Sequence, residues 1–146
     1  MDNNKGVLLS RRIVLSNNSS ECESLYMFLA DSLDQLPLTL EFKHDIKLVA
    51  EELLANIINH GYAKDANENI DLELTVDSSS VHLTFTDSGK AFNPLENDNP
   101  DLLNDLSEGG MGILLVKSLT DAQHYRRNNN QNVFTVTKNY NNNKTE

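Results

Sequence analysis

Apolar residues recur at helical spacing along residues 48–62, which predicts a helix that stops near Gly61. Its apolar face is formed by Leu48, Leu53, Leu54, Ile57 and Ile58. Glu52, Asn56 and His60 lie beside that face, each four residues apart, so they share one side of the helix. This polar stripe is either a solvated flank of the helix or one wall of a binding site, and motifs elsewhere in the chain distinguish the two.

The segment before this helix predicts a strand and a further helix. Residues 7–15 are rich in apolar side chains and predict a first strand. Ser20 and Glu23 have the spacing of a capping box, and a helical stripe of leucine and phenylalanine follows as far as Pro37. Thr39 can cap the next helix, which continues into the stretch described above.

After the central helix the pattern changes to a period of two. Strict alternation predicts strands at 70–76 and 81–85, joined by turn residues into an antiparallel hairpin. Residues 91–108 are rich in Asn, Asp and Pro and predict a long loop, of the kind associated with a lid or with disorder. The remaining expected elements are a helix at 113–119, strands at 122–127 and 133–138, and a disordered polar tail at 139–146. This order predicts an α+β fold with a mostly antiparallel sheet and helices on one face.

Composition narrows the classes of function. The 146 residues favour a single domain over 1–146. Lys+Arg 12 against Asp+Glu 22 gives a net charge of −10, which argues against nucleic-acid binding and against an anionic membrane surface. The single cysteine, Cys22, cannot form an internal disulfide, and neither a signal peptide nor an apolar run of about 20 residues is seen. We therefore expect a cytoplasmic protein without a membrane partner.

Two short motifs carry candidate ligand chemistry. Gly109, Gly110 and Gly112 precede a predicted helix, where glycine lets backbone N–H groups approach a phosphate, although a plain turn has the same composition. Asp87 and Gly89 follow a predicted strand. A carboxylate there can accept a hydrogen bond from an exocyclic amine such as that of adenine, while an ordinary Asp-Gly turn is the structural alternative.

The polar stripe of the central helix supplies the other candidates. The side-chain oxygen of Asn56 is a suitable Mg²⁺ ligand, and Glu52, one turn away, could act as a general base. Glu51 lies about 100° further round the helix and is expected to be a surface carboxylate. His60 is better explained as a partly exposed residue at the helix end. His44 lacks the helical hairpin that would accompany a phosphoacceptor histidine.

The conjunction of these motifs is more specific than any one of them. In chain order they are Glu51-Glu52-Leu53-Leu54-Ala55-Asn56, Asp87-Ser88-Gly89-Lys90-Ala91-Phe92-Asn93-Pro94 and Gly109-Gly110-Met111-Gly112. With these motifs the chain resembles the GHKL ATPase/kinase superfamily, and within it the small anti-sigma-factor serine/threonine kinases of bacteria. The resemblance covers residues 7–138, including the ending at 132–138.

The resemblance implies a two-layer Bergerat-type α/β sandwich with a mobile ATP lid over residues 95–108. It implies that Asp87 reads the adenine amine, that Gly89 lies under the ring, that Asn56 holds Mg²⁺ and that Glu52 is the catalytic base. The other nucleotide-binding positions that it implies are Phe92, Gly109, Gly110, Met111, Gly112 and Thr135.

The same resemblance implies a function and its partners. The substrate would be a small STAS-domain anti-anti-sigma protein, a sigma factor would be the competing partner, and the kinase would form a homodimer. Kinases of this group often carry an arginine in the lid just before the glycines, and residues 105–108 offer none. An ATP-gated binding module that holds a partner without phosphoryl transfer is therefore the alternative.

Overall fold

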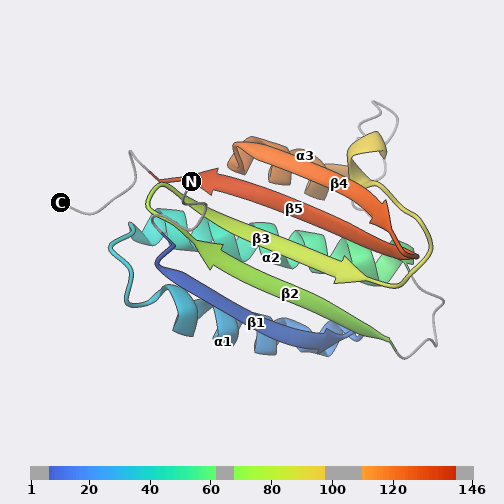
Figure 1. Cartoon of the computed structure of the whole chain (residues 1–146), viewed down its shortest axis with the longest axis horizontal. Helices are drawn as coiled ribbons and strands as arrows, with labels where there is room; N and C mark the ends of the chain where they lie inside the picture. Colours follow the sequence, from blue (N-terminus) through green and yellow to red (C-terminus); the bar gives the residue numbers. More distant parts are fainter. Residues whose placement is uncertain (1–6, 62–67, 98–109, 141–146) are drawn as a thin grey trace.

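The strands form a five-stranded sheet in the order β1-β2-β3-β5-β4, and every neighbouring pair is antiparallel (Figure 1). The computed structural model describes residues 7–61, 68–97 and 110–140. The strands are β1 (Leu9–Ser16), β2 (Asn69–Val76), β3 (Ser80–Asp87), β4 (Ala122–Asn128) and β5 (Gln131–Asn139). The helices are α1 (Cys22–Leu33), α2 (Leu40–Gly61) and α3 (Gly110–Leu119), with short 3₁₀ turns η1 (Ser19–Glu21) and η2 (Pro94–Asn97).

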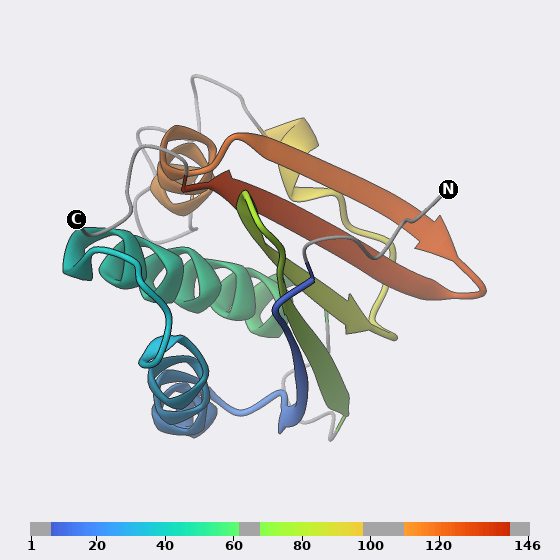
Figure 2. The same ribbon diagram turned by 60° about the vertical axis from the view of Figure 1, so that its left-hand side comes forward.

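All three described helices cover the same face of the sheet, as the two views together show (Figures 1 and 2). Alternation along each strand turns one set of side chains towards the helices and the other set away from them. In β2 the inward set is the apolar series Ile70, Leu72, Leu74 and Val76, all buried. The α+β fold expected from the hydrophobic pattern is confirmed. The apolar faces of the helices and of the strands are buried against each other in one core.

Of the two helix caps predicted from the sequence, the structure contains the one at α2 and lacks the one at α1. The hydroxyl of Thr39 accepts a hydrogen bond from the backbone N–H of Phe42 at 3.1 Å, so the predicted cap of α2 is confirmed. The predicted capping box at Ser20 and Glu23 is wrong. Glu21 is the N-cap of α1 without a side-chain cap bond. The turn η1 precedes the helix instead, and Asn18 accepts from the backbone N–H of Ser20 at 3.0 Å.

The end of the sheet extends further than the expected tail boundary. β5 runs to Asn139, and Tyr140 is only 3% exposed. The ring of Tyr140 meets Phe42 edge-on with centroids 6.0 Å apart, and its hydroxyl donates to the backbone carbonyl of Asp77. The first two residues of the expected tail at 139–146 therefore belong to the folded domain, and residues 141–146 lie outside the described part of the chain.

Candidate functional site

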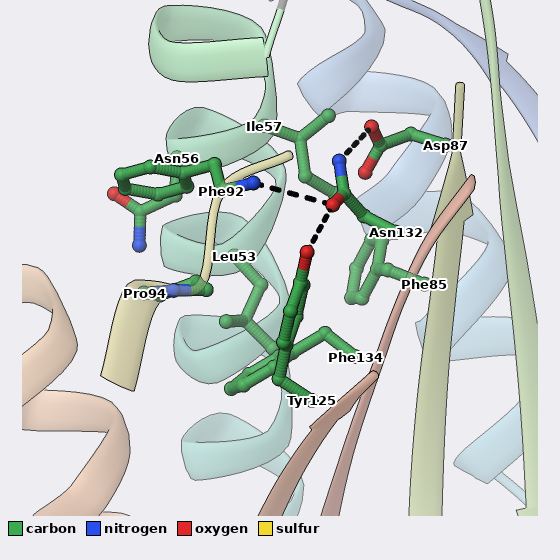
Figure 3. A pocket seen from close by; sticks show the side chains of 10 residues that line it. All are labelled: Leu53, Asn56, Ile57, Phe85, Asp87, Phe92, Pro94, Tyr125, Asn132 and Phe134. Atoms are coloured by element: carbon green, nitrogen blue, oxygen red, sulfur yellow. Dashed lines mark hydrogen bonds between the residues drawn. The ribbon is translucent and has the colours of Figure 1, made fainter. Parts of the chain in front are cut away.

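A pocket opens between α2 and the sheet where β3 ends (Figure 3). Leu53, Asn56 and Ile57 form its helical wall, and the segment after β3 contributes Phe92 and Pro94. The sheet contributes Phe85, Asp87, Tyr125, Asn132 and Phe134. These side chains make a largely apolar slot with a few polar groups, which is the usual composition of a small-molecule site.

Asp87 is the acidic group of the pocket, and its side chain is only 4% exposed. Its Oδ1 accepts hydrogen bonds from the backbone N–H of Gly89 at 2.9 Å and from Asn132 Nδ2 at 3.0 Å. No side chain or backbone group among the described residues donates to Oδ2. The pocket therefore presents one carboxylate oxygen as an acceptor, which is what recognition of an exocyclic amine requires.

Asn132 is a pocket residue that the sequence did not single out. Its side chain is 5% exposed and connects the start of β5 with the loop after β3 and with β4. The signal was present in the alternation of β5, because Asn132 shares a parity with the buried Phe134 and Val136. A polar residue at a core-facing position of a strand needs hydrogen-bond partners and is therefore a candidate for a site.

Thr135, in contrast, is not brought to the pocket. Its odd position in β5 turns it to the opposite face of the sheet from Phe134. There its hydroxyl lies 3.0 Å from that of Thr84 on β3. The nucleotide role implied for Thr135 does not fit this placement, since the sheet separates it from the pocket.

Asn56 projects from α2 into the pocket and is 7% exposed. Among the described residues no group hydrogen-bonds to its carboxamide. Because no fully buried side-chain nitrogen or oxygen among the described residues lacks a partner, the amide atoms of Asn56 face the open pocket, where a ligand or water can complete their hydrogen bonds or coordination. An amide oxygen that faces the pocket in this way has the chemistry of a Mg²⁺ ligand.

Glu52 lies one turn before Asn56 and is half-buried against the first turn of α3. A Cβ placed on Gly112 would be 2.3 Å from Glu52 Oε1, so only glycine leaves room for this carboxylate. Burial, with a smaller contribution from the charge of Glu51, raises the pKa of Glu52 above its usual value of 4.5. Glu51 itself turns to α1, where the hydroxyl of Tyr26 donates to its Oε1.

The remaining predicted positions divide between described and undescribed parts of the chain. Gly89 and Phe92 both contact the Asp87–Asn132 pair through backbone N–H groups. α3 begins at Gly110, so Gly110 and Gly112 occupy its first turn instead of preceding it. Outside the described residues lie Gly109, the loop at 98–109 and the side chains of Met111 and His60.

Comparison with known proteins identifies the domain. A model of the family described as "Histidine kinase-like ATPase domain" matches residues 15–138. The chain is similar to an anti-sigma F factor of Anoxybacillus flavithermus, with 31% identity over 90 residues, 60% of this chain and 62% of that protein. It is also similar to the serine/threonine-protein kinase BtrW of Bordetella bronchiseptica, with 32% identity over 95 residues, 63% of this chain and 67% of that protein.

A solved structure shares the fold. The crystal structure of the RsbU and RsbW domains of a Mycobacterium tuberculosis protein superposes with a TM-score of 0.62 at 16% identity, covering 90% of this chain and 32% of that one. The alignment with the anti-sigma F factor spans about three fifths of that relative's length. None of the described helices combines the length and the apolar character needed to cross a membrane. On the family match, which extends from β1 to β5, the chain belongs to the histidine kinase-like ATPase domain family.

Proposed function

We propose that this domain is a Mg-ATP-dependent protein serine/threonine kinase of the anti-sigma-factor type. It would phosphorylate a small STAS-domain anti-anti-sigma protein and regulate a sigma factor by partner switching in the cytoplasm. The observation that carries the proposal is the spacing on α2 of a half-buried Glu52 of raised pKa and, one turn later, Asn56, whose carboxamide faces the pocket. These residues supply a base and an oxygen ligand one turn apart on α2, and Asn56 lines the pocket.

The chemistry of the donor set supports ATP and Mg²⁺ as ligands. Asp87 offers an acceptor for the adenine amine, and the apolar side chains of the pocket suit a flat base. Asn56 would hold Mg²⁺ through its side-chain oxygen. No group of three or more His, Cys, Asp or Glu side chains that could hold a metal occurs within the described ranges. Phosphate and water oxygens would therefore complete the coordination, as is usual for this ion, which neutralises charge on the phosphates.

Glu52 is assigned the proton transfer. Its carboxylate would accept the proton of a serine or threonine hydroxyl while that oxygen forms a bond to the γ-phosphorus. The bond from that phosphorus to the β–γ bridging oxygen breaks, and ADP leaves with the electron pair. A glutamate whose pKa is raised by burial is a stronger base than an exposed one, which favours this role. The contact with Gly112 holds the carboxylate beside the positive end of α3.

The proposed partners rest on the relatives. One relative is called an anti-sigma F factor and another a serine/threonine-protein kinase, which together support a sigma factor and a phosphorylated regulator as partners. A homodimer, expected from the same resemblance, belongs to this proposal. The net charge of −10 is compatible with a basic protein surface on a partner.

Phosphoryl transfer from γ-labelled ATP to candidate STAS proteins tests the assignment. We expect label on a serine or threonine of one partner with the wild-type chain, and at least about 100-fold slower labelling with Glu52→Gln, which keeps the shape of the side chain. Calorimetry with Mg-ATP on both proteins is the control for binding. If wild-type protein binds ATP and labels no partner, the kinase assignment is wrong.

The second candidate is an ATP-gated binding module. Its support is the composition of the expected lid, where residues 105–108 contain no lysine or arginine that could stabilise the transferring phosphoryl group. Under this alternative Glu52→Gln leaves ATP-dependent capture of the partner intact, whereas under the kinase proposal it abolishes the phosphorylation that releases the partner.

A further inference from the structure

We infer that Asn132 is a positioning residue that decides which oxygen of Asp87 meets the base. It thereby makes the site select a 6-amino purine over a 6-oxo purine. The inference deepens the proposed ATP site and rests on it. It starts from the five hydrogen bonds that the buried carboxamide of Asn132 makes to three segments of the chain: the end of β3, the loop after it, and β4.

The partners leave this carboxamide a single orientation. Its Oδ1 is surrounded by three donors: the backbone N–H of Phe92 at 3.3 Å, the hydroxyl of Tyr125 at 2.5 Å and Arg127 Nη1 at 3.1 Å. Its Nδ2 faces two acceptors, Asp87 Oδ1 at 3.0 Å and the carbonyl of Lys90 at 2.9 Å. A flipped amide would set donors against donors at one end and acceptors against acceptors at the other. Nδ2 therefore always points at Asp87, as Figure 3 shows.

This fixed donor in turn fixes the carboxylate. Asp87 Oδ1 accepts hydrogen bonds from Nδ2 of Asn132 and from the N–H of Gly89. The carboxylate cannot rotate without losing at least one of these hydrogen bonds. Arg127 Nη1 also donates to the carbonyl of Gly89 at 2.8 Å, which ties the turn after β3 to the end of β4. The second carboxylate oxygen, Oδ2, is thereby held in one position, where it can accept a hydrogen bond from the ligand.

A carboxylate oxygen held in one place as an acceptor discriminates between bases by its hydrogen bonding. The 6-amino group of adenine donates to it, whereas the 6-oxo group of hypoxanthine sets oxygen against oxygen. A carboxylate free to turn could escape this clash by accepting from the N1–H of the 6-oxo base. Because Asn132 holds the carboxylate of Asp87 in place, this rotation is prevented. Asn132 therefore affects which base binds without contacting the base itself.

A merely structural Asn132 predicts something different. If it only joined the β4–β5 hairpin to the loop after β3, its loss would weaken binding of every purine nucleotide by the same factor. The measurement that separates the two roles is therefore the ratio of two dissociation constants, not either constant alone.

The test measures binding of ADP and of inosine diphosphate to the full chain with Mg²⁺ by calorimetry. Wild-type protein should bind ADP about 10- to 100-fold more tightly, the range expected when a buried acceptor meets an acceptor. Asn132→Ala should bring the two constants within about threefold. Thr135→Val is the matched control on the same strand, because it removes a hydroxyl contact on the opposite face and should leave the ratio unchanged.

Asn132→Asp gives a second variant of nearly the same shape, and it covers the case in which the alanine variant does not fold. It sets two carboxyl groups about 3.0 Å apart, so both cannot be ionised, and the ADP preference should become dependent on pH. A wild-type ratio near one, or variants that weaken both nucleotides equally at every pH, would overturn the role of Asn132. Failure of wild-type protein to bind either nucleotide would overturn the proposed function itself.

Discussion

Gly112 and Glu52 touch across the interface of α3 and α2, and the contact leaves no space for a side chain on Gly112. A Cβ there would lie 2.3 Å from Glu52 Oε1 and 3.3 Å from its carboxyl carbon. The obstacle is the far end of a flexible side chain, not backbone. A larger residue at position 112 should therefore displace the proposed base before it disturbs the packing of the helices.

Gly112→Ala tests this relationship. Alanine is favoured over glycine inside a helix by about 1 kcal/mol, so we expect a melting temperature equal to or above that of wild type. We expect phosphoryl transfer to fall about tenfold or more, because the carboxylate of Glu52 moves. Ser118→Ala, on the exposed side of the same helix, is the control. A variant with unchanged turnover and a lower melting temperature would contradict the proposed contact.

Glu52→Gln should stabilise the fold at neutral pH. The folded pKa of Glu52 is raised by burial and by Glu51, so its contribution to stability is present below the unfolded value, near 4.5, and is lost as pH rises through the folded value. Removing the charge should add about 0.5 kcal/mol at pH 7, the low end for such substitutions because the group is only partly buried. Urea denaturation of both proteins at pH 7 and pH 4 measures this, and the gain should shrink at the lower pH.

Asp87→Asn should reverse the preference for bases. The new amide must still accept from Gly89 and Asn132 through its oxygen, which turns its NH₂ group to the ligand. A donor there repels the amino group of adenine and attracts a 6-oxo group. ADP binding should weaken about 10- to 100-fold while binding of inosine diphosphate stays or improves, as measured by calorimetry. If this variant binds ADP like wild-type protein, Asp87 does not read the base.

Asp77 should make the fold sensitive to acid. Partial burial alone would raise its pKa, but His82 and the backbone N–H groups of Ser79 and Ser80 outweigh burial and lower the pKa below 3.8. This contribution to stability is present above the unfolded pKa and is lost as pH falls through the folded value. Asp77→Asn should cost about 1 kcal/mol at pH 6. The difference from wild type should shrink below about pH 4 in chemical denaturation, and a constant difference from pH 6 to pH 2.5 would argue against this account.

The β4–β5 turn offers a stabilising substitution. Asn129 and Asn130 both have positive φ, 52° and 65°, as a two-residue hairpin turn requires. Glycine adopts this region without steric cost, so Asn130→Gly should raise the free energy of unfolding by a few tenths of a kcal/mol, up to about 1. Asn130→Val should lower it by more than that. Thermal denaturation of both variants checks the opposite signs.

The fold could be predicted because the hydrophobic residues of each segment recur with a clear period. The residues of the site could be predicted only in part, because some of them are brought together by the pairing of strands that are distant in the sequence. Alternation along 70–76 and 81–85 placed the central hairpin, and helical spacing placed Asn56 and Glu52 on one side of α2. Asp87 and Asn56 meet in one pocket as expected.

The features that the sequence did not predict correctly differ from expectation for specific physical reasons. Asn132 and Tyr125 reach the pocket because β5 inserts between β3 and β4, a strand order that periodicity along the chain does not encode. Thr135 was assigned from a family resemblance, and a residue of the opposite parity on the same strand takes the place beside Asp87. The start of α1 depends on a 3₁₀ turn, which the spacing of Ser20 and Glu23 could not distinguish from a capping box.

The strand order also determines when the site comes into existence during folding. The pocket is assembled from residues 53–57, 85–94 and 125–134, so its walls meet only after the chain has closed loops of tens of residues. No fragment that lacks β5 contains the hydrogen-bonded pair of Asp87 and Asn132. A nucleotide that binds here recognises the finished domain alone, and at 100 times its dissociation constant it would add about 2.7 kcal/mol to the stability of every element at once. Nucleotide supply and protein lifetime would then be coupled, with depletion of the ligand exposing the whole chain to unfolding and proteolysis.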